Sequence, residues 1–405
     1  MKIKPFRVIC RGADANSGRC RCYFYQYVVF LLTFLHDCAK LQYMKKAEIL
    51  ASRNLNSRAE HHLPPTVIPA CTGNAVLDAN LYDLSRRFCG KHAPDVVLQM
   101  LASVMNAAGS EIEEHDLEMM NRTLNEMFAA DRMFHPYRNI RKITCFGSAR
   151  IQPQDASYQQ AVDFARRAVD NGYMIITGGG PGIMQACNEG AGKENSFGLN
   201  ITLPFEQHAN PFVAGSDKMM DFYYFYTRKL NFLKQTDALV AFEGGFGTMD
   251  EIYETITLMQ TGKCTIFPIV LLDVPGETFW HRWTRFIEKE LLDEGLISPA
   301  DMHLLYLSKS AEDAMAYIER FYRRFHSYYF EGEYCTIRLL EPVSDKLMDW
   351  IRHDYTDLMP KDDLVQIDDD TKDPEPALAA LPRLKFTLKR GDYARLKELL
   401  EAVND

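Results

Sequence analysis

The sequence predicts an α/β protein built on a doubly wound parallel sheet. Between residues 140 and 325, short apolar runs alternate with amphipathic stretches of helical period. Such alternation is typical of a parallel sheet that helices cover on both faces. Two glycine-rich segments lie where an apolar run ends and a helical stretch starts, and open parallel sheets bind their ligands at such places. We therefore expect a Rossmann-like domain over residues 140–325, with its chemistry in these loops.

The expected strands and helices alternate along this domain. Apolar runs predict strands over residues 140–146, 173–177, 199–203, 238–242 and 265–272. Helical periodicity predicts helices over residues 158–169, 183–193, 227–234, 249–260 and 280–292. Because each glycine-rich loop follows a strand and precedes a helix, both loops are expected at the same edge of the sheet.

Three further regions flank this domain. Residues 44–139 have apolar positions at three- and four-residue spacing, which predicts a helical region that caps the domain or mediates oligomerisation. Residues 326–405 predict a small C-terminal α+β appendage, with strands over 329–340 and 383–388 and helices over 344–355 and 393–402. Residues 1–43 differ in composition and form an atypical N-terminal extension.

The N-terminal extension carries seven basic and two acidic side chains within its 43 residues. Its apolar run, Tyr23 to Leu35, is too short to span a bilayer, and no small-residue cleavage site follows it. Met44 precedes a stretch with good helix formers, so we expect translation to begin at Met44 and residues 1–43 not to be translated. A membrane anchor is the alternative interpretation of the apolar run.

Charge and cysteine content exclude several classes of protein. The formal net charge is -9, whereas a protein that wraps nucleic acid needs a basic face. A single nucleotide remains compatible, because backbone N–H groups and one or two cations can hold a phosphate. The ten cysteines lack paired spacing, which argues against a zinc site or a disulfide framework. We expect a cytoplasmic protein that needs no metal or organic cofactor, with no nucleic-acid or membrane partner.

The first glycine-rich loop runs from Thr177 to Met184 and contains Gly179, Gly180 and Gly182. Glycines allow backbone N–H groups to approach a phosphate, and the N-terminus of the following helix adds a favourable dipole. The loop lacks the Gly-Lys-Ser/Thr sequence of a Walker motif. A tight turn explains these glycines equally well.

The second glycine-rich loop contains Gly244, Gly245, Gly247 and Thr248, and it also follows an apolar strand. This segment can form a second anion-binding nest. Glu251 falls in the first turn of the next helix, facing whatever the nest holds. A carboxylate there is often only dipole compensation, so catalysis and capping both remain open for Glu251.

A pair of cations, Arg228 and Lys229, starts the helix before the second loop. The guanidinium of Arg228 suits bidentate recognition of a phosphate or a sugar hydroxyl. Lys229 points about 100° away from Arg228 around a helix, so the two side chains have different surroundings. An ordinary surface pair is the alternative.

Together these segments resemble the LOG family, often labelled lysine decarboxylase-like, which includes cytokinin riboside monophosphate phosphoribohydrolases. The resemblance covers roughly residues 143–321. The family pattern Pro-Gly-Gly-x-Gly-Thr-x-x-Glu corresponds to residues 243–251, with Glu243 in place of the proline. The segment with Gly147, Ser148 and Arg150 and the triple-glycine loop with Met184 agree with the family as well.

The resemblance implies hydrolysis of the N-glycosidic bond of a nucleoside 5′-monophosphate, such as AMP or a cytokinin riboside monophosphate. It assigns catalysis to Arg228 and Glu251 and substrate or phosphate binding to the loop residues and Lys229. It also implies a homodimer or a higher homo-oligomer. Glu243 puts phosphate binding in doubt, unless its side chain points into the sheet edge or meets Arg228.

Other functions on this fold are also considered. A non-catalytic nucleotide sensor needs the phosphate nests but not the carboxylate of Glu251. Lysine decarboxylation would require pyridoxal phosphate on a Schiff-base lysine with an acidic partner, and no such pair stands out. A dehydrogenase is disfavoured, because the G-x-G-x-x-G fingerprint does not follow the first strand. The nucleotide hydrolase is therefore the first choice.

Overall fold

The computed structural model describes residues 71–88, 93–203, 208–276, 278–368, 370 and 373–405. The N-terminal extension, with the expected start at Met44, lies outside these residues. The chain divides into two compact units, residues 1–117 and 118–405. The described part of the first unit is helical, with α3 (Ala75–Phe88) and α4 (Pro94–Ala108), and α5 (Glu114–Phe134) crosses into the second unit.

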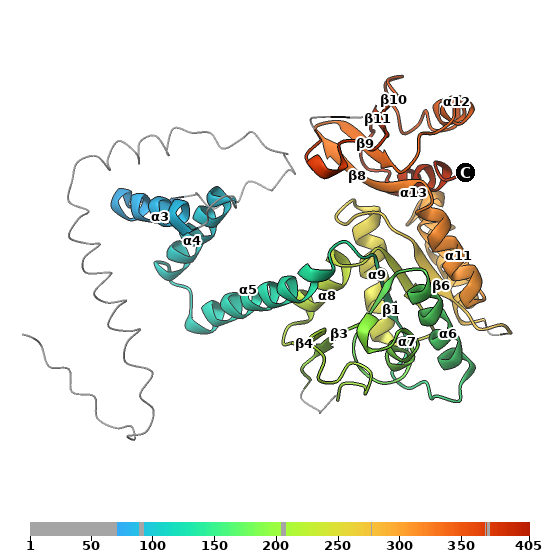
Figure 1. Cartoon of the computed structure of the whole chain (residues 1–405), viewed down its shortest axis with the longest axis horizontal. Coiled ribbons are helices and arrows are strands. Elements are labelled where there is room, and N and C mark those ends of the chain that lie inside the picture. Colours follow the sequence, from blue (N-terminus) through green and yellow to red (C-terminus); the bar gives the residue numbers. More distant parts are fainter. Residues whose placement is uncertain (1–70, 89–92, 204–207, 277, 369, 371–372) are drawn as a thin grey trace, which may run out of the picture. The chain divides into compact units, whose positions relative to one another are not determined.

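A seven-stranded parallel sheet forms the centre of the second unit and confirms the predicted α/β class (Figure 1). The strand order is β4-β3-β2-β1-β5-β6-β7, and every neighbouring pair is parallel. The strands are β1 (Lys142–Phe146), β2 (Met174–Thr177), β3 (Ser196–Ile201), β4 (Met219–Phe222), β5 (Ala238–Ala241), β6 (Ile269–Leu272) and β7 (Leu305–Ser308). The order reverses between β1 and β5, which makes their carboxyl ends the topological switch point.

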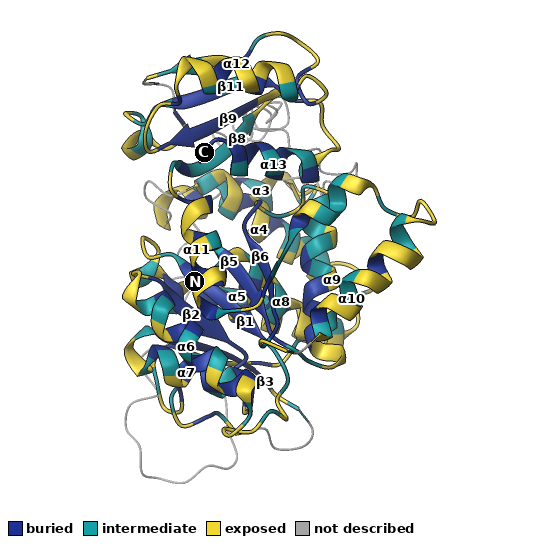
Figure 2. Cartoon of the chain, turned by 90° about the vertical axis from the view of Figure 1, so that its right-hand side faces the viewer, coloured by how far each residue is buried: buried dark blue, intermediate teal, exposed yellow. Residues whose placement is uncertain are grey.

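Helices cover both faces of this sheet, so its inner strands are buried (Figure 2). On one face α6, α7 and α11 pack beside one another, and α8, α9 and α10 lie on the other. Their bounds are α6 (Ala156–Asp170), α7 (Ile183–Ala191), α8 (Phe225–Lys234), α9 (Phe246–Gln260), α10 (Phe279–Ile287) and α11 (Ala311–Phe321). Continuous apolar strands need such two-sided cover, which explains why they lack a polar alternation.

The C-terminal half of α5 is anchored to the edge of the sheet. Phe134 stacks on Phe197 of β3 with ring centroids 4.5 Å apart. The buried carboxylate of Glu126 accepts hydrogen bonds from the backbone N–H of Tyr223 at 2.8 Å and from the hydroxyl of Thr227 at 2.5 Å. These bonds position the start of α8, which carries Arg228.

The C-terminal part of the chain forms a separate four-stranded antiparallel sheet of order β10-β11-β9-β8. Its elements are β8 (Phe325–Glu331), β9 (Tyr334–Leu339), α12 (Asp345–Asp354), β10 (Val365–Ile367), β11 (Arg383–Thr387) and α13 (Tyr393–Ala402). The single strand predicted over residues 329–340 is wrong. It is a hairpin, because Gly332 adopts a positive φ of 59° and reverses the chain between β8 and β9.

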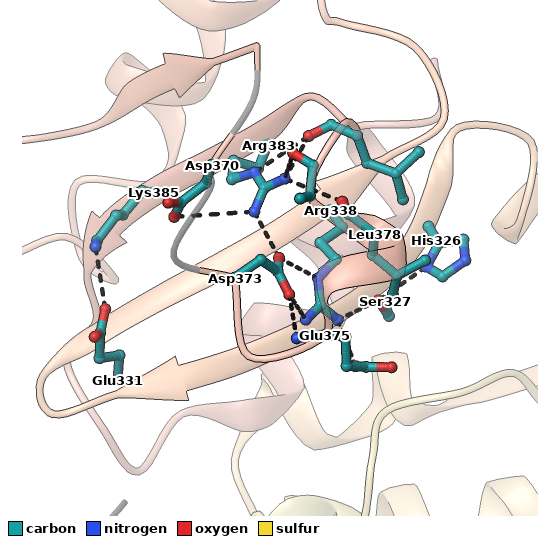
Figure 3. A network of polar contacts seen from close by, with 12 residues as sticks. His326, Ser327, Glu331, Arg338, Asp370, Asp373, Glu375, Leu378, Arg383 and Lys385 are labelled. Carbon is teal, nitrogen blue, oxygen red and sulfur yellow. Dashed lines mark hydrogen bonds and ion pairs between the residues drawn. The ribbon is translucent and has the colours of Figure 1, made fainter.

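A buried ion network joins this small sheet to the loop that precedes β11 (Figure 3). The carboxylate of Asp373 accepts two hydrogen bonds from Arg338, at 2.7 and 2.9 Å, and one from Arg383 at 2.6 Å. Arg383 also donates to the backbone carbonyls of Leu378, Ala379 and Leu381. The network therefore fastens the segment before β11, including the short 3-10 helix Pro376–Leu378, to the small sheet.

Two short strands of the central sheet, β4 and β7, were not predicted from the sequence, and neither was β10 of the small sheet. β4 lies at the edge of the sheet and is only partly buried, with Asp221 facing solvent, so it lacks the apolar run that marks the inner strands. β7 occupies the other edge and is half-buried along most of its length. In the part of the chain that the structure describes, every helix is too short or too polar to cross a lipid bilayer.

Candidate active site at the switch point of the sheet

A cavity of about 760 Å³ opens at the carboxyl ends of β1 and β5, where the strand order reverses. Three glycine-containing loops and the N-terminal turns of α8, α9 and α10 surround it. Its lining includes Gly147, Ser148, Arg150, Gly178, Met184, Arg228, Gly244, Gly245, Gly247, Thr248 and Glu251. A smaller cavity of about 350 Å³ lies by α11 and α13, around Tyr306, Tyr317 and Glu401, away from these loops.

Ser148 joins the three loops by backbone hydrogen bonds. Its N–H donates to the carbonyl of Glu243 at 2.9 Å, and its own carbonyl accepts from the N–H of Ile183 at 3.0 Å. Gly182 adopts a positive φ of 69°, and a Cβ there would lie 2.3 Å from the carbonyl oxygen of Ser148. Glycine is required at 182 both for this conformation and for this close approach.

The second glycine-rich loop leads directly into α9, whose N-terminus borders the cavity. Gly245 is the N-cap of this helix, so the first backbone N–H groups have no acceptor within the helix. A Cβ on Gly244 would lie 2.1 Å from the Thr248 hydroxyl oxygen, which explains the small residue at that position. Free N–H groups and the helix dipole together favour an anion here.

Arg228 also lines the cavity, and its guanidinium is hydrogen-bonded to the backbone beside a glycine that leaves room for it. Its Nε donates to the carbonyl of Leu199 at 2.8 Å. Its Nη2 lies where a Cβ on Gly178 would be only 2.6 Å away, so glycine at 178 makes room for the guanidinium. Burial lowers the pKa of Arg228 and the charge of Glu251 opposes this effect, but an arginine stays protonated.

Glu251 is the buried carboxylate of the site, with 8% of its surface exposed. Burial raises the pKa of Glu251 to about 7, while the positive charges of Lys229 and Arg228 act in the opposite direction. A carboxyl group that titrates near neutral pH in a cavity is typical of an acid or base that takes part in a reaction.

Lys229 points away from Arg228, toward carboxylates in the second and third turns of α9. The helix begins at Phe246 and has no acidic residue in its first turn, so the prediction that places Glu251 there is wrong. The ammonium of Lys229 lies 2.8 Å from Asp250, 2.5 Å from Glu254 and 4.0 Å from Glu251. It does not line the cavity, whereas Arg228 does. Lys229 is therefore placed to hold the carboxylates of α9 together.

Other predicted residues of the first loop lie behind the cavity wall. Gly179, Gly180 and Gly182 are absent from the lining, although Gly178 and Met184 belong to it. The carbonyls of Gly179 and Gly180 accept hydrogen bonds from Asn210, at 2.8 and 3.0 Å. These glycines shape the loop that carries the lining residues.

Aromatic side chains form much of the remaining wall, and sequence reasoning missed most of them. Phe146, Phe246 and Phe279 line the cavity together with Phe225, which was considered as a residue that stacks on the base. Phe222, from the same aromatic run, is fully buried in the core. Phe279 is the first residue of α10, the helix that follows β6. Since the carboxyl end of β6 lies beside that of β5, this position in the sequence could have predicted that Phe279 lines the cavity.

The side chain of Glu243 does not approach Arg228. It accepts a hydrogen bond from the Ser157 hydroxyl at 2.5 Å, in the first turn of α6. Among the residues that the structure describes, no three His, Cys, Asp or Glu side chains come together as they would around a metal ion.

Comparisons with known proteins agree with this architecture. Residues 184–318 match the family model described as "Possible lysine decarboxylase". A probable cytokinin riboside 5′-monophosphate phosphoribohydrolase of Oryza sativa subsp. japonica is 30% identical over 186 residues, which cover 44% of this chain and 84% of the relative. A cytokinin riboside 5′-monophosphate phosphoribohydrolase of Arabidopsis thaliana is also 30% identical, over 44% of this chain and 81% of the relative.

Among solved structures, a molybdenum cofactor carrier protein from Chlamydomonas reinhardtii aligns with 45% of this chain and 97% of its own, at 20% identity and a TM-score of 0.32. The rice relative is matched over most of its length, and the residues that match the family model include Arg228, the second glycine-rich loop and Glu251. The chain therefore belongs to the LOG family.

Proposed function

We propose that this protein hydrolyses the N-glycosidic bond of a nucleoside 5′-monophosphate and releases the free base and ribose 5-phosphate. AMP and cytokinin riboside monophosphates are the expected kinds of substrate. The relatives named as phosphoribohydrolases support this proposal. The observation that carries it is the buried Glu251, which lies in the second turn of α9 and lines the same cavity as the N-terminus of that helix.

The cavity offers an anion-binding helix terminus for the phosphate of a ribose phosphate and a carboxylate for its sugar ring. The N–H groups at the start of α9 would bind the phosphate, and Arg228 adds a positive charge that remains at every physiological pH. Glu251 is five residues farther along α9, a rise of about 7.5 Å from the first residue of the helix, so it would lie beyond the phosphate, on the side of the sugar. The aromatic side chains around Phe225 and Phe279 offer faces on which a base can stack.

In the proposed reaction the bond between C1′ and the base nitrogen breaks while water attacks C1′. The ribose acquires oxocarbenium character, which the negative carboxylate of Glu251 stabilises. Glu251 also orients the water and accepts its proton, and the departing base takes up a proton in turn. The products are the free base and ribose 5-phosphate, so the reaction balances with water alone.

The test is chromatographic detection of free base and ribose 5-phosphate after incubation with AMP, GMP, CMP, UMP and isopentenyl-AMP. Wild-type protein is expected to release base from at least one of them. Glu251→Gln keeps the shape of the side chain but cannot accept the proton, so turnover should fall by at least about a hundredfold while nucleotide binding persists. Tight binding by calorimetry without any release would instead identify a nucleotide sensor.

The proposal extends to a homodimer in the cytoplasm. Large apolar side chains that do not line the cavity are exposed on α8 and α9, including Tyr226 and Leu230 on α8 and Tyr253 on α9. Exposed apolar side chains in such number are typical of a surface that binds a partner. Sedimentation velocity should give twice the monomer mass, and Leu230→Asp should give monomers. A wild-type protein that sediments as a monomer at micromolar concentration would contradict the dimer.

A further inference from the structure

Glu243 is the residue at which this chain departs from the family pattern. Its side chain and its backbone carbonyl both accept hydrogen bonds. The carboxylate accepts the hydroxyl hydrogen bond of Ser157 at 2.5 Å. Ser157 is buried and is the second residue of α6. The dipole of a helix favours a negative charge at its N-terminus, so α6 stabilises the carboxylate of Glu243 in this position.

The backbone of Glu243 connects the same residue to the other two loops. Its carbonyl accepts from Ser148, and the carbonyl of Ser148 accepts from Ile183 at the start of α7. Gly244 and the rest of the anion-binding nest follow immediately. The tether between Glu243 and Ser157 therefore acts at the point where the second glycine loop leaves β5.

A proline would be compatible with this backbone position. In the part of the chain that the structure describes, the N–H of Glu243 donates to no protein acceptor, so a proline ring would remove no intramolecular hydrogen bond. The residue before a proline favours extended backbone, and Phe242 directly follows strand β5. A proline ring fixes φ covalently, whereas a glutamate leaves the backbone free unless its side chain is held.

From these contacts we infer that Glu243 and Ser157 are a pair of positioning residues for the anion-binding nest. The side-chain hydrogen bond restrains the first residue of the loop, as a proline ring would do at the same position. The nest then keeps its N–H groups directed at the phosphate without rearranging when a ligand binds. The inference rests on the proposed function for its catalytic readout, and its binding readout is independent of hydrolysis.

The experiment is a double-mutant cycle with Glu243→Ala, Ser157→Ala and the double variant. Affinities for AMP, ribose 5-phosphate and inorganic phosphate are measured by calorimetry, and KM and kcat are measured separately. Each single variant should weaken phosphate-ligand affinity by about tenfold, with the change in KM larger than that in kcat. The double variant should be no weaker than either single variant, because both remove the same bond.

Two further variants at position 243 distinguish the tether from charge or loss of packing. Glu243→Gln retains an acceptor for Ser157, so its affinity should stay within about threefold of wild type. Glu243→Pro should likewise restore affinity relative to Glu243→Ala, and Ser157→Ala should have no effect in the proline background. Unfolding free energies of all variants show whether any loss of affinity reflects a loss of folded protein.

Additive effects of Glu243→Ala and Ser157→Ala would overturn the inference, as would a Glu243→Pro protein that binds as weakly as Glu243→Ala. A wild-type protein that binds these ligands but releases no base would overturn the proposed hydrolysis. The affinities of the double-mutant cycle would still test whether Glu243 and Ser157 act together. If the protein hydrolyses nucleotides but Glu243→Ala and Ser157→Ala show no coupling in ligand affinity, the positioning role is overturned and the proposed hydrolysis is not. Failure to bind any of the three ligands would overturn both.

Discussion

At the scale of single residues, the chemistry of the site depends on the balance of charge around Glu251. Burial raises the pKa of this carboxyl to about 7, and the nearby Asp250 and Glu254 raise it as well. Lys229 and Arg228 lower it. Since Lys229 lies 4.0 Å from Glu251 and outside the cavity, it acts on the carboxylate without needing to touch a substrate.

This balance predicts a pH dependence for the wild-type enzyme. The proposed role of Glu251 requires the ionised form, so kcat/KM should rise as the pH increases through about 7. Lys229→Met removes a positive charge that favours the ionised carboxylate. The pKa of Glu251 should then rise, and the ascending limb of the profile should move to higher pH by about one unit.

Lys234→Met is the matched control for this variant. Lys234 lies on the same helix and pairs with Asp131 at 3.2 Å on the surface, away from Glu251. Its removal should leave the midpoint of the profile unchanged. Identical midpoints for Lys229→Met and wild type would contradict the assigned role of Lys229.

At the scale of elements, α9 connects the site to the C-terminal part of the chain. The helix begins at the anion-binding nest and ends before Gly262, which adopts a positive φ of 67°. A Cβ on Gly262 would lie 2.1 Å from the ring of Tyr393, at the start of α13. The turn after α9 is therefore packed directly against the helix that closes the C-terminal sheet.

Gly262→Ala is expected to destabilise the protein for two reasons. The left-handed conformation costs about 1 kcal/mol for alanine, and overpacking against Tyr393 costs about 1–3 kcal/mol more. Gly295→Ala separates these effects, because Gly295 has a φ of 70° and nothing within 4 Å of its Cβ position. Denaturant unfolding should show the larger loss for Gly262→Ala, and equal losses for the two variants would exclude the contact with Tyr393.

At the scale of the whole molecule, buried polar contacts join the two sheets of the second unit. The ammonium of Lys397 on α13 is fully buried and donates to the carbonyl of His303 at 2.9 Å. The hydroxyl of Tyr328 on β8 accepts from the N–H of Ile266, just before β6. We therefore expect the two sheets to unfold together, so that damage to the small sheet lowers the stability of both.

The ion network of the small sheet gives a test of this expectation. Asp373→Asn leaves two buried guanidinium groups without their shared carboxylate and should destabilise the protein by about 3–5 kcal/mol. The hydrogen bonds from Arg338 lower the pKa of Asp373 to about 2, below its ordinary value of 3.8. The carboxylate therefore stabilises the fold above pH 3.8, and this contribution is lost as the pH falls through about 2.

Chemical denaturation monitored by circular dichroism at pH 7 measures this loss. Glu375→Gln is the control, because Glu375 also pairs with Arg338 but its side chain is 64% exposed, and its loss should cost less than about 1 kcal/mol. A single transition at lower denaturant concentration is expected for Asp373→Asn. Two separate transitions would show that the sheets unfold independently.

Local sequence predicted most of the central domain. The alternation of apolar runs and helical stretches is a short-range property, and so is the presence of glycine where the backbone adopts a positive φ or packs closely. The strands that escaped prediction are β4 and β7 in the central sheet and β10 in the small sheet. All three lie at a sheet edge, where half-exposed faces blur the apolar signal. The hairpin at Gly332 was missed because a single glycine between two glutamates is the whole turn signal that separates its two aromatic strands.

By itself, the sequence determined the fold class, the position of the glycine loops at strand ends, and the residue types from which the proposed phosphate site is built. Only the tertiary structure decided which of those residues meet. Ser157 reaches Glu243 across 86 positions of the chain, Lys229 turns toward α9 and not into the cavity, and burial sets the pKa of Glu251. Hydrogen-bond partners and desolvation depend on neighbours that are distant in the sequence, and no local pattern encodes them.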